Sequence, residues 1–547
     1  MNFVWLDINA SWSHSSLALP ALHAQLDSNT KNECNWQVVR GTIKSDIASI
    51  IEQIIQTQPT YIFATCWLFN NNYINEVLCR VNAICKPKGI FLGGPEFLGN
   101  NQEFLNARPY ITAVFKGEGE EMFPAFVKAL LSSNNKWKEI PGWEYIENGL
   151  YHSSGEENVK DFASLITPEE SELFSWDKSF VQLETSRGCF NSCKFCVSGI
   201  SKAPVQDLPI RSIQNRLDTI VSKGIKEVRI LDRTFNANPK RAKEFIDLAA
   251  KYKSKLKFHL EIHPALIRGE FKEVLETVPE DLLHVEAGIQ SLQENVLLAC
   301  SRIGTNQKAI EGLKYLLSTN KFEVHADLIA GLPEYSYNQL VKDTISLMEI
   351  GPHEIQLESL KLLAGTFFRN NSESLGIEYS PTPPYEVLKT KDISYKEISK
   401  AMTLSKILDF WYNDSRWRNL FKKIICKEND LLEEMVCYLH GTEYITQPLS
   451  LESKGILLYR FCKEKAAHFL KDVALEWIKN GLSINKEPAE LFKQWHFKDS
   501  DIENPVFDKD NIRNKYYYLI TESQIHWFIF NKEIERIAPI RYYIQDL

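Results

Sequence analysis

Two regions of the chain alternate short apolar runs with helical patterns, and this alternation constrains the fold more than any other feature. Between residue 2 and about residue 131 the apolar runs are NFVWLDI, WQVVRGT, YIFATCW, IFLGGPE and ITAVFKGEGEE. Helical patterns separate or follow them, for example at residues 16–26 and 123–131. Because β-branched and aromatic strands that alternate with helices form parallel sheets covered on both faces, we expect an α/β domain here, doubly wound and Rossmann-like.

The second alternating region runs from residue 180 to about residue 366. Its six strand candidates are VQLETS, EVRILD, KFHLEI, LHVEAGIQS, EVHADLIAGLP and EIQLESLKLL. Six βα units of this length favour a partial or complete (β/α) barrel, in which catalytic groups lie at the carboxyl ends of the strands. The polar residues at those ends are therefore the candidates for a site.

We expect four parts in the chain. Residues 1–135 form the first domain, residues 136–178 a polar linker, residues 179–369 the barrel, and residues 370–547 a helix-rich C-terminal domain. The linker is rich in Gly, Ser, Glu and Asn, which is typical of loops with at most one hairpin. The last part begins with a proline-broken connector and ends with two alternating segments, KYYYLI and IHWFIF, which predict a hairpin.

Charge and hydropathy narrow the class of protein. The net charge of the 547 residues is −8, so no global basic field attracts nucleic acid, which is not the default partner. The start of the chain has no basic leader before an apolar core, and no stretch nears the roughly 18 apolar residues that span a bilayer. We expect a cytoplasmic protein that does not bind a membrane.

Three of the eleven cysteines lie together in GCFNSCKFC, at positions 189, 193 and 196, and the other eight are expected to be reduced, buried thiols. A thiolate triplet binds zinc, an iron–sulfur cluster or nothing. Zinc needs four ligands, and a fourth would have to come from a distant histidine such as His259, His263 or His284. Three thiolates in one loop can instead ligate three irons of a four-iron cluster and leave the fourth iron open, whereas electron-transfer clusters usually have four cysteines.

The segment VQLETSRGCFNSCKFC resembles the C-x-x-x-C-x-x-C signature of radical S-adenosylmethionine (radical SAM) enzymes, in the form common in their cobalamin-binding branch. The resemblance implies that Cys189, Cys193 and Cys196 ligate a 4Fe-4S cluster whose open iron chelates S-adenosyl-L-methionine. It also implies that Phe195 lies near the adenine, and that an electron donor such as flavodoxin or ferredoxin is a partner.

Later strand ends extend this resemblance. In LDRTFN, the residues Asp232, Arg233 and Thr234 stand where the family holds the methionine end of S-adenosylmethionine. Arg233 replaces a frequent acidic residue, and it either pairs with Asp232 or binds the methionine carboxylate. The segments HVEAGIQS and DLIAGLP resemble the fourth- and fifth-strand motifs, which implies contacts with ribose and methionine from Glu286, Gln290 and Ser291, and with adenine from Ile329, Gly331 and Leu332.

Two further acidic residues belong to these strands. Glu261 ends the third strand and is expected to point into the mouth of the barrel, whereas Asp327 has the simpler interpretation of a solvated residue at a strand end.

Two glycine motifs of the first domain resemble those of cobalamin-binding domains fused to radical SAM barrels. They supply the candidate cofactor-binding residues Gly93, Gly94, Pro95 and Glu96 in LGGPE, and Gly117, Glu118 and Gly119 in KGEGEE. The chain has no D-x-H motif to ligate cobalt, so the resemblance favours cobalamin bound without histidine. The loop at residues 65–70 would then approach the corrin, although its Trp67 and Phe69 are equally typical of core aromatics.

The expected function is that of a cobalamin-dependent radical SAM enzyme, a transferase that moves a methyl group from S-adenosylmethionine or performs a related radical reaction. The substrate, a small molecule or a peptide, is not identified by the sequence, and no residue is assigned as catalytic. One alternative is a radical SAM enzyme that does not bind cobalamin, with the first domain as a docking module. The other is a non-enzymatic iron–sulfur electron carrier or scaffold, against which the three-cysteine set argues.

Overall fold

The computed structural model describes residues 1–132, 135–200, 204–496, 502, 514–530, 539 and 541–546. The chain divides into two compact units: Met1–Ser336 with Ser359–Tyr395, and Tyr337–Glu358 with Lys396–Leu547. No helix within the described ranges combines the length and the apolar character needed to cross a membrane.

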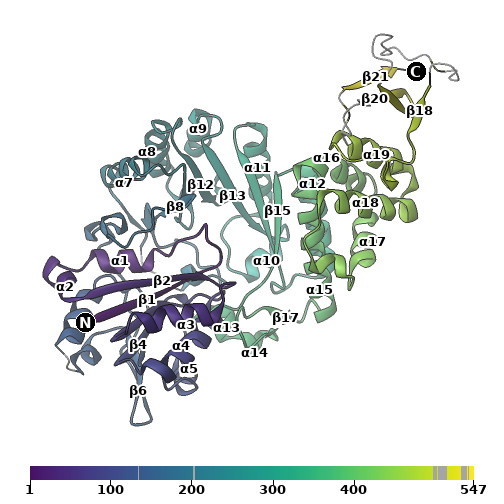
Figure 1. Cartoon of the computed structure of the whole chain (residues 1–547). Coiled ribbons are helices and arrows are strands. Elements are labelled where there is room, and N and C mark those ends of the chain that lie inside the picture. The colour runs from purple at the N-terminus through teal and green to yellow at the C-terminus, as the bar shows by residue number, and fades with distance from the viewer. Residues whose placement is uncertain are drawn as a thin grey trace. The chain divides into compact units, whose positions relative to one another are not determined.

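The first unit begins with a seven-stranded sheet of order β2-β1-β3-β4-β5-β6-β7, in which β1 to β5 are parallel. Helices cover both faces, as Figure 1 shows for α1 on one side and α3 and α4 on the other. The expected doubly wound domain is confirmed. Its elements are β1 (Asn2–Asn9), α1 (Ala18–Ala24), α2 (Ser28–Glu33), β2 (Asn35–Thr42), α3 (Ile47–Gln56), β3 (Tyr61–Thr65), α4 (Asn71–Cys85), β4 (Gly89–Gly93), α5 (Gln102–Asn106), β5 (Ala113–Phe115), α6 (Phe123–Leu131), β6 (Trp143–Glu147) and β7 (Leu150–Ser153).

Each face of this sheet has its own apolar core, because alternate residues of a strand point to opposite sides. Val4 packs with Ile54 of α3 and Val77 of α4 on one face. Its neighbour Phe3 packs with Leu19 of α1 on the other face, in a cluster rich in aromatic rings. The parallel strands are therefore buried on both sides, which explains their nearly continuous apolar sequences.

The hairpin β6–β7 lies in the stretch expected to be a linker, and it extends the first sheet. Strand β6 pairs antiparallel with β5, with Val114 opposite Glu144. The buried Glu144 carboxylate accepts hydrogen bonds from Asn101, Tyr151 and Ser153, each at 2.6 Å. This set of bonds fixes the hairpin to the sheet.

The second sheet of the first unit is parallel and has the order β14-β13-β12-β11-β8. Among the described strands of this sheet β8 pairs only with β11, so the sheet stays open and forms a partial barrel. All six expected strands form, and the last of them, β15 (Glu354–Ser359), belongs almost wholly to the second unit. The other elements are β8 (Phe180–Leu183), β9 (Ser186–Arg187), β10 (Gln206–Asp207), α7 (Ile210–Ser222), β11 (Glu227–Ile230), α8 (Pro239–Ala250), β12 (Lys257–Ile262), α9 (Glu270–Thr277), β13 (Leu283–Gln290), α10 (Glu294–Ala299), α11 (Asn306–Ser318), β14 (Glu323–Ala330), α13 (Phe367–Asn370), α14 (Ser372–Leu375), β16 (Glu378–Tyr379) and β17 (Val387–Lys389).

The second unit is helix-rich, as expected, and ends in an antiparallel sheet of order β18-β19-β20-β21. The expected hairpin is β19–β20. Trp417 and Phe421 are fully buried and Phe410 nearly so, which makes this aromatic set part of the core. The elements are α12 (Tyr337–Ile350), α15 (Tyr395–Ile407), α16 (Ser415–Lys427), α17 (Asp430–Leu439), α18 (Leu451–Lys465), α19 (Leu470–Lys479), β18 (Lys493–Trp495), β19 (Lys515–Ile520), β20 (Gln524–Phe530) and β21 (Arg541–Asp546).

All eleven cysteines are free thiols. The expectation that the eight cysteines outside the triplet are buried holds for Cys34, Cys66, Cys300 and Cys462. It is wrong for Cys79 and Cys437, which are exposed because they lie on the solvent side of α4 and α17, and Cys85 and Cys426 are half-buried.

Candidate active site

The cysteine loop follows β8 and β9, at the carboxyl end of the first barrel strand. Cys193 is buried, whereas Cys189, Cys196 and Phe195 are half-buried. The backbone amide of Lys194 donates to the carbonyl of Cys300 at 3.0 Å, which fixes the middle of the loop. Within the described ranges no three His, Cys, Asp or Glu side chains converge closely enough to hold a single metal ion.

The geometry of a cluster differs from that of a single ion. Thiolates on one zinc lie roughly 3.8 Å apart because Zn–S bonds measure about 2.3 Å. Cysteines that ligate different irons of a cluster do not share one centre. The donor set of the loop, three thiols on one short segment, fits three irons of such a cluster.

Arg302 connects the cysteine loop to β13. Its guanidinium donates to the Gly288 carbonyl at 2.6 Å and lies 3.8 Å from the Cys193 sulfur. Burial raises the pKa of the Cys193 thiol, and the positive charge of Arg302 opposes that rise. The sequence analysis does not single out Arg302, because it belongs to no motif and no periodic pattern of neighbouring residues.

Asp232 follows β11 and is buried, and it fastens the end of β8. Its carboxylate accepts hydrogen bonds from the amides of Thr185 and Ser186 at 2.7 and 2.9 Å, and from the Thr185 hydroxyl. Burial raises the pKa of this carboxyl, and these donors counteract the rise. Arg233 does not pair with Asp232 in the described structure; it is exposed and lines a cavity. The hydroxyl of Thr234 lies 3.8 Å from the Cys189 sulfur.

The fourth-strand residues lie where β13 ends in an irregular turn. The register of β13 against β14 shifts between Gly288 and Gln290, and Gln290 has a φ of +71°. Bulges and positive φ values in residues other than glycine are concentrated at functional sites. The Gln290 side-chain oxygen is buried with no hydrogen-bond partner among the described residues. Ser291 is buried, and its hydroxyl accepts from the Gln293 amide at 3.1 Å.

The fifth-strand residues differ in their accessibility. Ile329 is half-buried near the end of β14, and Gly331 turns the chain with a φ of +86°. Leu332 is fully buried. The structure therefore places Ile329 where a ligand can reach it and Leu332 in the core.

Six ionisable side chains lie together on one face of β12, β13 and β14, and we call them the barrel-face cluster. The strand register sets His259 opposite His284, Glu261 opposite Glu286, and Glu286 opposite His325. His259 hydrogen-bonds to Glu286 at 3.2 Å, and His284 to His325 at 3.3 Å. The members are His259, Glu261, His284, Glu286, His325 and Asp327.

Asp327 is not the solvated strand-end residue that the sequence suggested. One oxygen of its carboxyl is buried without a hydrogen-bond partner among the described residues, and burial, together with the charge of Glu286, raises its pKa well above the ordinary value. Burial also raises the pKa of Glu261, to about 7, and the neighbouring Glu286 carboxylate adds to this rise. Glu286 therefore lies among several ionisable side chains. The contact with ribose that the resemblance implies for Glu286 does not account for these neighbours.

The first glycine motif lies beyond β4. Gly93, Gly94 and Pro95 line a cavity, whereas Glu96 is buried outside it and accepts hydrogen bonds from Asn71 at 2.6 Å and Tyr385 at 2.8 Å. A Cβ on Gly94 would lie 2.6 Å from the carbonyl of Cys66. The close passage of the neighbouring backbone therefore requires this glycine.

The second glycine motif lies beyond β5, and Gly117, Glu118 and Gly119 all line the same cavity. A Cβ on Gly117, whose φ is +109°, would collide with the backbone of Glu157. Burial raises the pKa of Glu118, although its carboxylate accepts from the Val159 amide at 2.7 Å. Both glycine motifs thus have a structural role in addition to their position at the cavity.

Arg187, two residues before Cys189, joins the glycine motif to the cysteine loop. Its guanidinium contacts Glu120 at 2.9 Å, Glu184 at 2.6 Å and Glu118 at 3.9 Å. Burial alone would lower the pKa of Arg187, but these three carboxylates outweigh it and raise the pKa. The sequence analysis does not single out this residue, although Arg187 and Gly188 directly precede the first cysteine.

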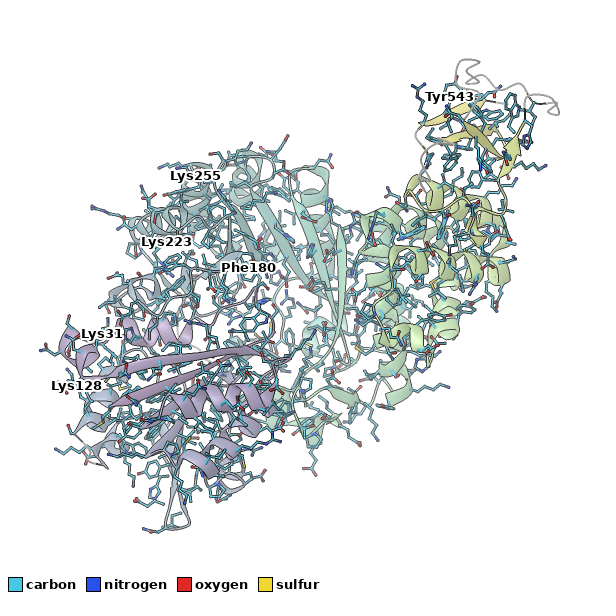
Figure 2. All side chains as sticks on the ribbon, viewed as in Figure 1. Lys31, Lys128, Phe180, Lys223, Lys255 and Tyr543 are labelled. Atoms are coloured by element: carbon cyan, nitrogen blue, oxygen red, sulfur yellow. The ribbon has the colours of Figure 1, made fainter. Side chains whose placement is uncertain are left out.

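The cavity has a volume of about 630 Å³ and lies within the first unit. Its wall combines the ends of β1, β3, β4 and β5 with barrel residues, including Gln182, Glu184, Arg187 and Arg233. Phe180, labelled in Figure 2, begins the first barrel strand, and the His14 ring packs edge-on against it with centroids 5.1 Å apart. His14 also lines the cavity.

Trp67 and Phe69 are not core aromatics. Each is 38% exposed, and both line the cavity. Their rings are nearly parallel, with centroids 6.4 Å apart and an interplanar angle of 12°. This loop therefore presents a flat apolar surface at the end of β3.

Comparisons with known proteins match this architecture. The family model of the radical SAM superfamily matches residues 183–344, and that of a protein of unknown function, DUF4080, matches residues 373–525. The chain is 26% identical over 329 residues to a protein of Pyrococcus horikoshii named uncharacterized methyltransferase PH0819, covering 57% of this chain and 69% of the relative. It is 21% identical to the cobalamin-dependent radical SAM methyltransferase TokK of Streptomyces tokunonensis, covering 54% of this chain and 46% of TokK, which is less than half of that relative.

Solved structures share the fold. The cobalamin-dependent S-adenosylmethionine radical enzyme OxsB, with aqua-cobalamin and S-adenosylmethionine bound, has a TM-score of 0.64 at 15% identity, over 87% of this chain and 81% of OxsB. The radical S-adenosylmethionine methyltransferase TsrM of Kitasatospora setae has a TM-score of 0.54 at 14% identity, over 71% of this chain and 82% of TsrM. Residues 183–344 are thus a radical SAM domain, the domain of an enzyme, and residues 373–525 match the DUF4080 family.

Proposed function

We propose that this protein is a cobalamin-dependent radical SAM methyltransferase, which moves a methyl group from S-adenosylmethionine to a small-molecule or peptide substrate. The observation that carries the proposal is one cavity of the first unit. Both glycine motifs line it, and so does Arg187, two residues before the first cysteine, so this space adjoins both regions expected to bind cofactors. The names of PH0819 and TokK, both methyltransferases, support the reaction class.

The residues of the chain have distinct roles in this proposal. Cys189, Cys193 and Cys196 hold a 4Fe-4S cluster, and Arg302 keeps a positive charge beside the buried Cys193 thiol. Gln290 and Arg233 offer a polar oxygen and a guanidinium for the methionine end of S-adenosylmethionine. When bound, the cofactors supply the reductive and methyl-transfer chemistry, and the protein supplies position and exclusion of water.

The first domain holds cobalamin in this proposal. Gly93, Gly117 and Gly119 form the backbone wall of the cavity, and the parallel rings of Trp67 and Phe69 provide an apolar surface next to it. Aromatic surfaces suit a large flat macrocycle, because they bury apolar area without leaving polar groups unsatisfied. An electron donor of the flavodoxin or ferredoxin type completes the system.

Anaerobic reconstitution with iron, sulfide and hydroxocobalamin tests the proposal. We expect about four irons per chain, in keeping with a four-iron cluster, together with one bound corrin. We also expect turnover of S-adenosylmethionine under dithionite. Cys193→Ala is expected to lose iron, and the exposed Cys437→Ala of the second unit serves as the matched control that keeps it.

The outcomes separate the competing functions. Four irons and turnover without retained corrin would support the radical SAM enzyme that does not use cobalamin. A protein that binds iron but never turns over S-adenosylmethionine would refute both enzymatic proposals. Full iron content in Cys193→Ala would contradict the ligand assignment.

A further inference from the structure

The loop after β1 brings one histidine to the cavity of the first unit. This loop covers residues 10–17, between β1 and α1, and His14 lies in its middle. Among the described residues that line the cavity, His14 is the only histidine. Strands β1 and β3 are parallel neighbours, so their carboxyl ends lie at the same edge of the sheet. His14 therefore lines the cavity from the strand next to the one whose loop carries Trp67 and Phe69.

The imidazole ring of His14 is held in place by its neighbours. Its Nδ1 lies 2.8 Å from the hydroxyl oxygen of Ser11 and 3.3 Å from that of Ser13, and both contacts are hydrogen bonds. One edge of the ring packs against Phe180, the first residue of β8 and labelled in Figure 2. A hydrogen bond at one ring nitrogen is the usual support of a histidine that ligates a metal through the other nitrogen, because it fixes the tautomer and the orientation of the ring.

The second ring nitrogen, Nε2, is left for a ligand. It has no hydrogen-bond partner within the part of the chain that the structure describes. Partial burial lowers the pKa of His14, and the charge of Arg229 lowers it further, so the ring is neutral at pH 7. The tautomer with its proton on Nδ1 donates that proton to the Ser11 hydroxyl and keeps the lone pair on Nε2.

The carboxylates of the cavity are less suited to a metal than His14 is. Those among the described lining residues are Glu118, Glu120 and Glu184, and all three contact the guanidinium of Arg187. An imidazole nitrogen is also the commonest protein ligand of transition metals. The cavity thus presents one oriented imidazole, next to the apolar rings of the β3 loop.

We propose that His14 is an axial ligand of the cobalt of cobalamin, bound through Nε2. The inference rests on the proposed function, and it differs from the histidine-free binding that the sequence resemblance favours. The new bond uses the lone pair of Nε2 and displaces a water molecule from cobalt, so no electron is transferred and no proton is released. The chain supplies this ligand without a D-x-H motif, because the β1 loop itself carries a histidine to the cavity.

Electron paramagnetic resonance of bound cob(II)alamin tests this bond directly. The full-length protein is prepared with ordinary histidine and with nitrogen-15 histidine, loaded with hydroxocobalamin and mildly reduced to the Co(II) state. An axial nitrogen-14 ligand splits each cobalt line into three, whereas nitrogen-15 splits it into two. We expect the three-line pattern from the ordinary protein and the two-line pattern from the labelled one.

Variants identify which histidine is bound. His14→Ala should lose the nitrogen splitting, and unlabelled imidazole added to the nitrogen-15 form of this variant should restore a three-line pattern. His152→Ala is the matched control, because His152 belongs to β7 of the same unit and does not line the cavity, so it should keep the splitting.

The possible outcomes separate this ligand from the proposed function. A three-line pattern in both isotopic forms would identify the benzimidazole of cobalamin as the ligand and would overturn the proposal. An unsplit spectrum, or a two-line pattern that survives His14→Ala, would overturn it as well. In each of these cases the corrin is bound and the proposed function stands. A wild-type protein that retains no corrin would instead refute the proposed use of cobalamin, and this ligand with it.

Discussion

The ion pair between Arg216 and Glu169 ties the stretch before the barrel to α7, and its removal should destabilise the first unit strongly. The two side chains are only 5% and 3% exposed. Two hydrogen bonds join them, at 3.0 and 2.9 Å, and a third N–H of Arg216 donates to the Glu184 carbonyl at 3.1 Å. The charge of Arg216 is therefore desolvated and depends on one carboxylate.

Glu169→Gln leaves this guanidinium buried beside a neutral amide. Removing one partner of a buried pair costs about 3–5 kcal/mol, because the remaining charge has lost its solvent and its counter-ion. We expect a decrease of that size in the free energy of unfolding, measured by urea titration with tryptophan fluorescence. Glu227→Gln is the matched control, since its pair with Arg229 is about 40% exposed on both sides and should contribute less than about 1 kcal/mol.

A double variant distinguishes charge from packing. Glu169→Leu combined with Arg216→Met removes both charges and keeps apolar volume, so we expect it to be more stable than Glu169→Gln alone. If Glu169→Gln stays within about 1 kcal/mol of the wild type, the reasoning from desolvation is wrong. If the double variant is as unstable as the sum of the single ones, packing rather than charge dominates.

Three further predictions follow from single positions. Gly117→Ala should unfold at lower urea concentration than Gly149→Ala, because both residues have positive φ but only the Cβ at position 117 meets neighbouring backbone; equal losses would contradict this. Burial lowers the pKa of His23 to about 4, so the unfolded state takes up a proton first as the pH falls below about 6.5, and stability should drop by about 2 kcal/mol between pH 7 and pH 4.5. Urea titrations at pH 7 and 4.5 measure this, and His23→Gln should reduce the dependence. Asp232→Asn weakens an acceptor of hydrogen bonds from Thr185 and Ser186, and should lower the free energy of unfolding by about 2–3 kcal/mol in the same assay. An unchanged free energy would show that these donors do not need a carboxylate.

Patterns that depend on neighbouring residues were predictable from the sequence. The helix at Phe123–Leu131 forms with the expected bounds, because its apolar spacing specifies both the helix and the buried face. The strand ends that carry glycine, Gly93 and Gly117, lie at one cavity because parallel strands end at the same edge of a sheet. The six barrel strands were predictable for a similar reason, because apolar runs alternate with helical patterns along residues 180–366.

Contacts between distant segments were not predictable in this way. The hairpin β6–β7 reads as a polar linker, and only its pairing with β5 makes it part of the sheet. Glu96 belongs to a cofactor motif by sequence, yet a tyrosine 289 residues later takes its carboxylate out of the cavity. The barrel-face cluster could have been predicted from the sequence of β13. Its polar residues His284, Glu286 and Gln290 alternate with buried ones, and such alternation is unusual for a strand inside a parallel sheet.

The placement of Arg187 has a consequence for how the protein acquires iron. Arg187 lies two residues before the first cysteine. Its guanidinium is held by Glu118 and Glu120 in the loop after β5 of the first domain, and by Glu184 of the barrel. The segment that leads into the cysteine loop is thus ordered by a part of the chain that is synthesised earlier. The three thiols are presented to incoming iron by a folded first domain, so variants that unfold that domain should lose metal even though every cysteine is intact.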